Sequence, residues 1–303
     1  MTPEDDYTLR TIRRRFGAFE RFCLGTAAVL GTLFVAASVQ GARREAEMGQ
    51  QLVARRAELG DGLDARHTTI LHREAAATRE LATTEAPDVA SPSALPSLQG
   101  GGVYLRVISS RATEESDVLR ASRESSKDAF ASCLSLGVRD TERETSACAP
   151  ESGCVGDATS KLVNLRILLA GLAPFHDGWS ARAKDASGIE LTVLASELDV
   201  AASGALTRAR KAVDEASFVL LAVDDVPKGT RMDWGETGLA TVQTLPHDVK
   251  IAVLDARTFE PLFRAKLRAD AVPSASPGAN SSVLRQVQGC SLGLAVAERL
   301  RGG

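Results

Sequence analysis

Residues Gly289 to Gly293 read Gly-Cys-Ser-Leu-Gly and match the Gly-x-Ser-x-Gly pattern of serine hydrolases. In those enzymes the serine lies on a sharp turn between a strand and a helix, and a histidine later in the chain activates it. All four histidines of this chain precede Ser291, and only ten residues follow Gly293. The apolar residues around the pattern also have helical spacing. We therefore interpret the match as coincidental and expect Ser291 to lie within one helix.

Two histidines are each followed directly by an aspartate, in the pairs His176-Asp177 and His247-Asp248. A carboxylate can orient an imidazole that acts as a general base. Neighbours along a chain seldom face one another, however, and both pairs lie close to a proline, as turn residues often do. We interpret both pairs as turn residues, with a catalytic role as the alternative.

The remaining histidines, His67 and His72, are five residues apart, so they do not share a helical face as an i, i+4 metal pair would. The glycine run 100–102 is not followed by the Lys-Ser/Thr pair of a phosphate-binding loop. The sequence therefore predicts solvated histidines, no metal site and no cofactor.

A polar loop after a predicted strand is the strongest candidate for a binding site. Six apolar residues, 218–223, predict a strand that is covered on both faces, and ligands gather beyond the carboxyl ends of strands in open sheets. The spacing of the acids does not match a calcium loop, and a plain solvated loop is the simpler interpretation. The candidate residues of this loop are Asp224, Asp225, Arg231, Asp233 and Trp234.

Four cysteines lie in the last two thirds of the chain: Cys133, Cys148, Cys154 and Cys290. They lack the Cys-x-x-Cys spacing and the nearby histidines of a zinc site. Two disulfides in an oxidising compartment are the simplest explanation, with four reduced thiols as the alternative. Three pairings are possible. Loop-closure entropy would stabilise the folded chain by about 5 kcal/mol for a Cys133 to Cys290 bond and by about 2 kcal/mol for a Cys148 to Cys154 bond. These values do not select between the pairings.

An uncharged apolar segment runs from Phe22 to Val39, with arginines on both sides. At about 1.5 Å per helical residue its length approaches the ~30 Å hydrocarbon core of a bilayer. We predict a transmembrane signal anchor over residues 22–40, and a cleaved signal peptide is the alternative. The small residues Ala28, Thr32 and Ala36 could support a weak homodimer.

The anchor divides the chain into five predicted parts. Residues 1–21 would form a cytoplasmic tail, and residues 41–86 an Ala-, Arg- and Glu-rich helical stalk. Prolines, serines and glycines in residues 87–102 predict a linker. Residues 103–303 would then form a periplasmic or extracellular domain. This last part carries 24 Lys and Arg against 26 Asp and Glu, a balance that argues against a nucleic-acid partner.

The pattern of apolar residues predicts an α+β outer domain, with a small mixed sheet of about four strands covered by helices. The first strand alternates as if one face were buried, and the last has a basic face that suits a sheet edge. The predicted strands are 103–107, 218–223, 249–254 and 262–269, and the main helices are 161–172, 179–201, 205–216 and 283–300.

These features favour a single-pass protein of the bacterial cell envelope, anchored in the plasma membrane with its N-terminus in the cytoplasm. Its disulfide-bonded domain would bind an envelope protein that the sequence does not identify, without catalysis. The alternative is a membrane-tethered hydrolase that uses His247 or His176 with Asp224 or Asp225.

Overall fold

The structure is a computed structural model that describes residue 34 and residues 37–302, except 126–127, 139–161, 231–236 and 271–280. The chain divides into two compact units, one made of residues 1–57 and 178–195 and the other of residues 58–177 and 196–303. The sheet and all the sites described below belong to the second unit.

The first unit is helical in its described part, with residues 37–57 in one helix and with α7 (Trp179–Asp185) and the start of α8 (Ile189–Val200). The sequence predicts one helix over 179–201, but the structure interrupts it before Ile189. Gly188, at the break, has a φ of +53°, a conformation that glycine adopts without strain. Its backbone N–H donates a hydrogen bond of 3.0 Å to the carboxylate of Glu45.

Most of the predicted anchor, residues 22–33 with 35 and 36, lies outside the described residues. Among the residues that the structure describes, no helix is both long and apolar enough to cross a membrane.

In its described residues the second unit contains a mixed sheet of six strands in the order β1-β6-β5-β4-β2-β3. Strands β2, β3 and β4 are parallel, whereas β5, β6 and β1 continue the sheet in antiparallel pairs. The strands are β1 (Val89–Ala90), β2 (Gly101–Ile108), β3 (Leu162–Asn164), β4 (Ala216–Asp224), β5 (His247–Asp255) and β6 (Pro261–Ala269).

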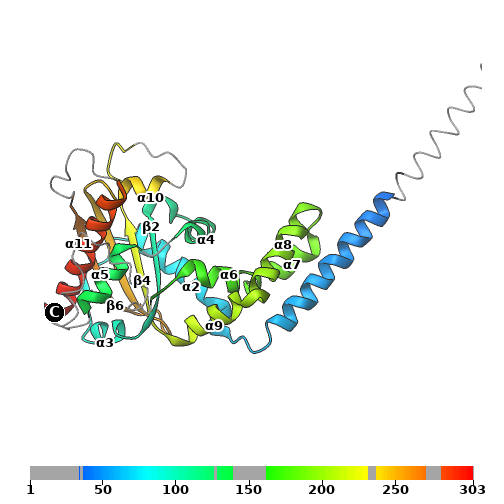
Figure 1. Cartoon of the computed structure of the whole chain (residues 1–303), viewed down its shortest axis with the longest axis horizontal. Coiled ribbons are helices and arrows are strands. Elements are labelled where there is room, and N and C mark those ends of the chain that lie inside the picture. Colours follow the sequence, from blue (N-terminus) through cyan, green and yellow to red (C-terminus); the bar gives the residue numbers. More distant parts are fainter. Residues whose placement is uncertain are drawn as a thin grey trace, which may run out of the picture. The chain divides into compact units, whose positions relative to one another are not determined.

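Helices cover both faces of this sheet, as Figure 1 illustrates. Side chains of successive strand residues point to opposite faces, so β4 contributes Val219, Leu221 and Val223 to one core and Phe218 and Leu220 to the other. The first core is closed by α2 (Ala65–Thr83), α4 (Glu115–Glu124), α6 (Leu165–Leu172) and α9 (Leu206–Glu215). The second is closed by α3 (Ala94–Leu98), α5 (Ala129–Val138) and α11 (Ser281–Gly302). A short helix, α10 (Thr237–Val242), precedes β5.

The sequence predicts an α+β domain with a mixed sheet covered by helices; the mixed sheet and its helices are confirmed, but the predicted count of about four strands is too low. The four predicted strands correspond to β2, β4, β5 and β6. The additional strands, β1 and β3, have only two and three residues, which is too short for an alternating pattern to be recognised. The prediction of one buried face for β2 is also wrong, because all its residues from Gly102 to Ile108 are buried.

Two segments predicted as stalk and linker differ from those expectations. Helix α2, in the predicted stalk, places Ile70 and Leu71 in the first core, with exposed fractions of 1% and 2%. The predicted linker over 87–102 contains β1 and α3 and the beginning of β2. Both segments contribute to the second compact unit, Glu58–Asp177 with Ser196–Gly303.

Helices α5 and α11 pack tightly against each other on the second core and are joined by a disulfide between Cys133 and Cys290. Gly293 of α11 allows this close approach, because a Cβ at that position would lie 2.5 Å from the carbonyl oxygen of Phe130. Ser291 is exposed on the same helix, as the sequence predicts. The Gly-Cys-Ser-Leu-Gly pattern thus serves helix packing and does not form a nucleophile turn.

Candidate functional site

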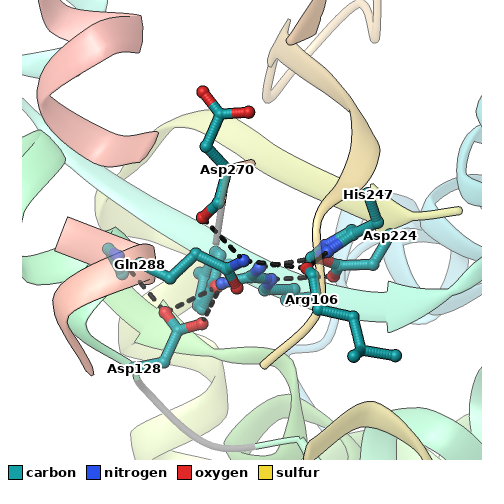
Figure 2. Close-up of polar contacts among 9 residues, drawn as sticks. Arg106, Asp128, Asp224, His247, Asp270 and Gln288 are labelled. Carbon is teal, nitrogen blue, oxygen red and sulfur yellow. Dashed lines mark hydrogen bonds and ion pairs between the residues drawn. The ribbon is translucent and has the colours of Figure 1, made fainter. Parts of the chain in front are cut away.

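A cluster of buried polar side chains lies where the parallel strands β2 and β4 end. Tyr104 and Arg106 come from β2, Asp224 is the last residue of β4 and His247 is the first of β5. By strand alternation these side chains project to the face covered by α5 and α11. Asp128, which immediately precedes α5, completes the cluster. We call these five residues the buried network, and Figure 2 shows Asp128 and Asp224 beside Arg106, with His247 next to Asp224.

Arg106 is the centre of the buried network. Its Nε and Nη2 donate to the two carboxylate oxygens of Asp224 at 2.8 and 2.6 Å, and its Nη1 donates to Asp128 at 2.7 Å. Only 3% of the Arg106 side chain is exposed, and Asp224 is completely buried. A bidentate ion pair of this kind is the strongest arrangement of an arginine and a carboxylate, and it fixes the orientation of both side chains.

Asp128 connects the sheet to the beginning of α5. One of its carboxylate oxygens accepts a hydrogen bond from the Tyr104 hydroxyl at 2.8 Å and another from the backbone N–H of Ala131 at 3.3 Å. The latter satisfies one of the free N–H groups at the start of the helix. Burial raises the pKa of Tyr104 well above its usual value, and the nearby Asp128 carboxylate raises it further. Tyr104 is therefore a neutral hydrogen-bond donor.

His247 is held by two hydrogen-bond acceptors. Its Nδ1 lies 2.7 Å from the backbone carbonyl of Leu245, and its Nε2 lies 2.6 Å from Asp224. A carbonyl oxygen can only accept, and an ionised carboxylate can also only accept. The Nδ1–H therefore donates to the carbonyl of Leu245, and Nε2 is held against the Asp224 carboxylate, so neither ring nitrogen faces solvent.

The charges in the buried network are paired. Burial alone would raise the pKa of Asp224, but Arg106 and His247 outweigh it and hold the pKa below its ordinary value. Burial opposes the charge of Arg106, yet Asp224 and Asp128 raise its pKa well above the usual range. The buried guanidinium thus has two carboxylate partners, which is the condition under which charges are tolerated inside a protein.

Gln288 connects the buried network to α11, the helix on which it lies. Its side-chain Nε2 donates to the backbone carbonyl of Leu245 at 2.9 Å and to that of Asp270 at 3.2 Å. The carbonyl of Leu245 thus accepts from both His247 and Gln288. Together with Gln288, the buried network therefore links strands β2, β4 and β5 to the start of α5 and to the first half of α11.

The structure separates the residues of the predicted binding loop. Asp224 is inside the buried network, whereas Asp225 is partly buried and its backbone N–H donates to the carbonyl of Asp248 at 2.8 Å. Burial raises the pKa of Asp225. The remaining candidates, Arg231, Asp233 and Trp234, lie outside the described residues.

Of the four candidate disulfide cysteines, Cys133 and Cys290 are bonded to each other. Cys148 and Cys154 lie outside the described residues, so their predicted bond stays a prediction. The confirmed bond joins residues that are 157 positions apart.

The histidines differ most from their predicted roles. His247 is a buried member of a strand and not a turn residue. His67 was expected in solvent, but only 3% of it is exposed, and it caps the start of α2 with Asp64 and lies 3.0 Å from Asp214. His72 and His176 both lie near Glu115.

Sequence reasoning missed Arg106, Asp128 and Gln288. One signal was present, because Arg106 lies in the middle of a strand whose other residues are apolar apart from Tyr104. A charge in a doubly covered strand needs a buried partner. The partners come from positions 22 and 118 residues away, which local patterns do not reveal.

Neither a scan against protein-family models nor searches of curated proteins and of solved structures returned a match to this chain. Its function is therefore inferred from the geometry of the described residues.

Proposed function

We propose that this chain is a membrane-anchored extracytoplasmic protein of the bacterial cell envelope, whose disulfide-bonded domain binds another envelope protein and performs no catalysis. The Cys133 to Cys290 disulfide supports an extracytoplasmic location, because such bonds persist in oxidising compartments and are rare in the cytosol. In this proposal residues 22–40 anchor the chain in the plasma membrane with its N-terminus in the cytoplasm.

The geometry of His247 is the observation that most strongly supports a non-catalytic domain. A general base needs a free lone pair within reach of a substrate proton. His247 is completely buried, and both its nitrogens are held by groups of the protein itself. Asp224 has no free oxygen either, since Arg106 and His247 occupy both. The buried network is therefore built to fix strands and helices in place.

A tethered hydrolase is the second candidate, because the fold does bring His247 and Asp224 into contact, as that hypothesis requires. Burial and saturation of both groups argue against it. The near-neutral charge of the outer region supports a protein partner and not a nucleic acid. The lipid bilayer, and a weak homodimer through residues 22–40, complete the proposed partners.

Protease treatment of intact spheroplasts tests the proposed location. A full-length chain with a C-terminal epitope should lose that epitope when protease is added outside the intact inner membrane, while a cytosolic control protein survives. If the epitope is cut only after the membrane is permeabilised, the proposed topology is wrong.

Cross-linking tests the proposed binding role. An impermeant lysine-reactive reagent applied to the same cells should join the domain to a specific envelope protein through exposed lysines such as Lys211 and Lys266, which are 73% and 43% exposed. Recovery of the domain without any cross-linked partner, together with a hydrolytic activity that His247→Ala abolishes in a folded chain, would favour the hydrolase.

A further inference from the structure

Two imidazoles and a carboxylate meet on the face of the sheet opposite the buried network. His72 lies on α2, Glu115 is the first residue of α4, and His176 directly follows a short 3-10 helix, Ala173–Phe175. These elements all close the first core. Three segments that are distant in sequence thus bring metal-ligating side chains to one point.

The distances between the ligand atoms suit a bound metal ion. Oε1 of Glu115 lies 2.9 Å from Nδ1 of His72 and 3.5 Å from Nε2 of His176, and the three ligand atoms all lie within 4.8 Å of one another. A tetrahedral zinc ion with ligand atoms about 2.0–2.1 Å away holds those atoms roughly 3.3 Å apart. Side-chain shifts of about 1 Å would therefore complete the site.

The hydrogen bond on the far side of His176 is the arrangement found behind metal ligands. Its Nδ1 lies 2.8 Å from the backbone carbonyl of Asp177, so Nδ1 must carry a proton and donate. In the neutral ring the lone pair is then on Nε2, the atom that points at Glu115. Ligating histidines usually donate their other N–H to such a carbonyl, which orients the ring.

The backbone beneath the three side chains is firmly held. His72 follows Leu71, and His176 follows Phe175, two core residues with exposed fractions of 2% and 4%. Glu115 is one helical turn before Val118, which is completely buried. The side chains themselves reach the surface, with exposed fractions of 60% for His72, 32% for Glu115 and 30% for His176. An ion can therefore enter from solvent.

We propose that His72, Glu115 and His176 bind one divalent transition-metal ion, with Zn²⁺ as the best match. Two imidazoles and one carboxylate suit zinc and its neighbours, whereas calcium and magnesium prefer oxygen ligands alone. Three protein ligands leave at least one coordination position for water or for an anionic group of a partner.

Titration of the metal-free full-length chain tests this site. Zn²⁺ alone is the probe, measured by competition with a chromophoric chelator, and Co²⁺ reports the coordination through its visible absorption. We expect one equivalent to bind with a Kd of about 10 µM or tighter. His72→Ala, His176→Ala and Glu115→Gln should each weaken binding at least roughly tenfold.

Glu114→Gln is the matched control, since Glu114 is exposed and adjacent to Glu115, and it should leave the Kd unchanged. Circular dichroism and urea unfolding establish that each variant is folded, and His72→Ala, at the most exposed position, keeps the test decisive if His176→Ala fails to fold. Failure of the wild-type chain to bind Zn²⁺ below 1 mM, or binding that survives all three ligand substitutions, would overturn the proposal.

Discussion

Nε2 of His247 lies 2.6 Å from Oδ1 of Asp224, and both side chains are completely buried. The same oxygen accepts from Arg106 at 2.6 Å. His247 and Asp224 resemble the histidine and aspartate of a catalytic triad. Here both are held inside the buried network, and neither has a lone pair that faces solvent. This contact supports the proposed structural role of the cluster.

Removal of the central carboxylate should be strongly destabilising. Asp224→Ala leaves the buried guanidinium of Arg106 and the imidazole of His247 without their common partner, and we expect a loss of about 3–5 kcal/mol in the free energy of unfolding. Urea denaturation measures it. Asp248→Ala is the control, because Asp248 pairs with Arg268 at the surface and should cost about 0–1 kcal/mol. Equal effects of the two substitutions would contradict a structural role for the network.

The same carboxylate should give the protein an acid-sensitive stability. The pKa of Asp224 is lowered in the folded chain, so the unfolded chain takes up a proton first as the pH falls. The contribution is complete above the unfolded pKa of about 3.9 and is lost as the pH falls through the lower folded value. We expect Asp224→Asn to flatten the dependence of the unfolding free energy on pH below about 4. An unchanged acid slope in this variant would argue against the assignment.

A second buried carboxylate should act in the opposite direction. Glu74 of α2 is completely buried, and neither carboxylate oxygen has a hydrogen-bond partner among the residues described. Burial raises its pKa well above 4.5, so above that pH the unfolded chain releases a proton that the folded chain keeps. Stability then falls as the pH rises.

We therefore expect Glu74→Gln to raise the free energy of unfolding by at least about 1 kcal/mol at pH 8 and by less at pH 4. Thermal unfolding at the two pH values measures the difference. Glu80→Gln on the same helix is the control, since Glu80 is 61% exposed, and it should change little. A Glu74→Gln variant that is less stable than wild type at pH 8 would indicate that the carboxylate has a stabilising partner.

Adding one methyl group at Gly293, where α5 and α11 are in contact, should lower the stability of the fold. In Gly293→Ala the new Cβ would lie 2.5 Å from the carbonyl oxygen of Phe130 and 2.8 Å from the backbone nitrogen of Leu134. The helices must separate, at a cost of about 1–3 kcal/mol in chemical denaturation. Gly302→Ala, in the last turn of the same helix, meets nothing within 4 Å and should be neutral. If Gly293→Ala were also neutral, the two helices would not pack this closely.

The main strands of the second unit could be predicted because their signals are local. Six consecutive apolar residues predict β4, and basic residues that alternate with apolar ones predict β6. In the structure β6 lies next to the edge strand β1. Helix α11 is similarly evident from its spacing. The short strands β1 and β3 and the break before Ile189 depend on tertiary contacts and on a single glycine, so the local pattern does not reveal them.

The sites were harder to predict because they join distant segments. The hydrolase alternative pairs Asp224 with His247, but the other partner of Asp224, Arg106, is 118 residues away and is not predicted. The sequence suggests comparing His72 with His67 and His176 with Asp177, and only the fold brings His72 and His176 to Glu115. Nearness in sequence therefore does not identify contacting residues where parallel strands, joined by crossover helices, bring distant segments together.

The oxidation state of Cys133 and Cys290 in the cell tests the central claim most directly. Intact cells expressing the full-length chain are quenched in acid, free thiols are blocked under denaturing conditions, and the digested protein is analysed by mass spectrometry with and without reductant. We expect the peptides containing Cys133 and Cys290 to be recovered linked to each other and to separate only after reduction. Recovery of both cysteines as blocked free thiols before reduction would contradict an oxidised, extracytoplasmic domain.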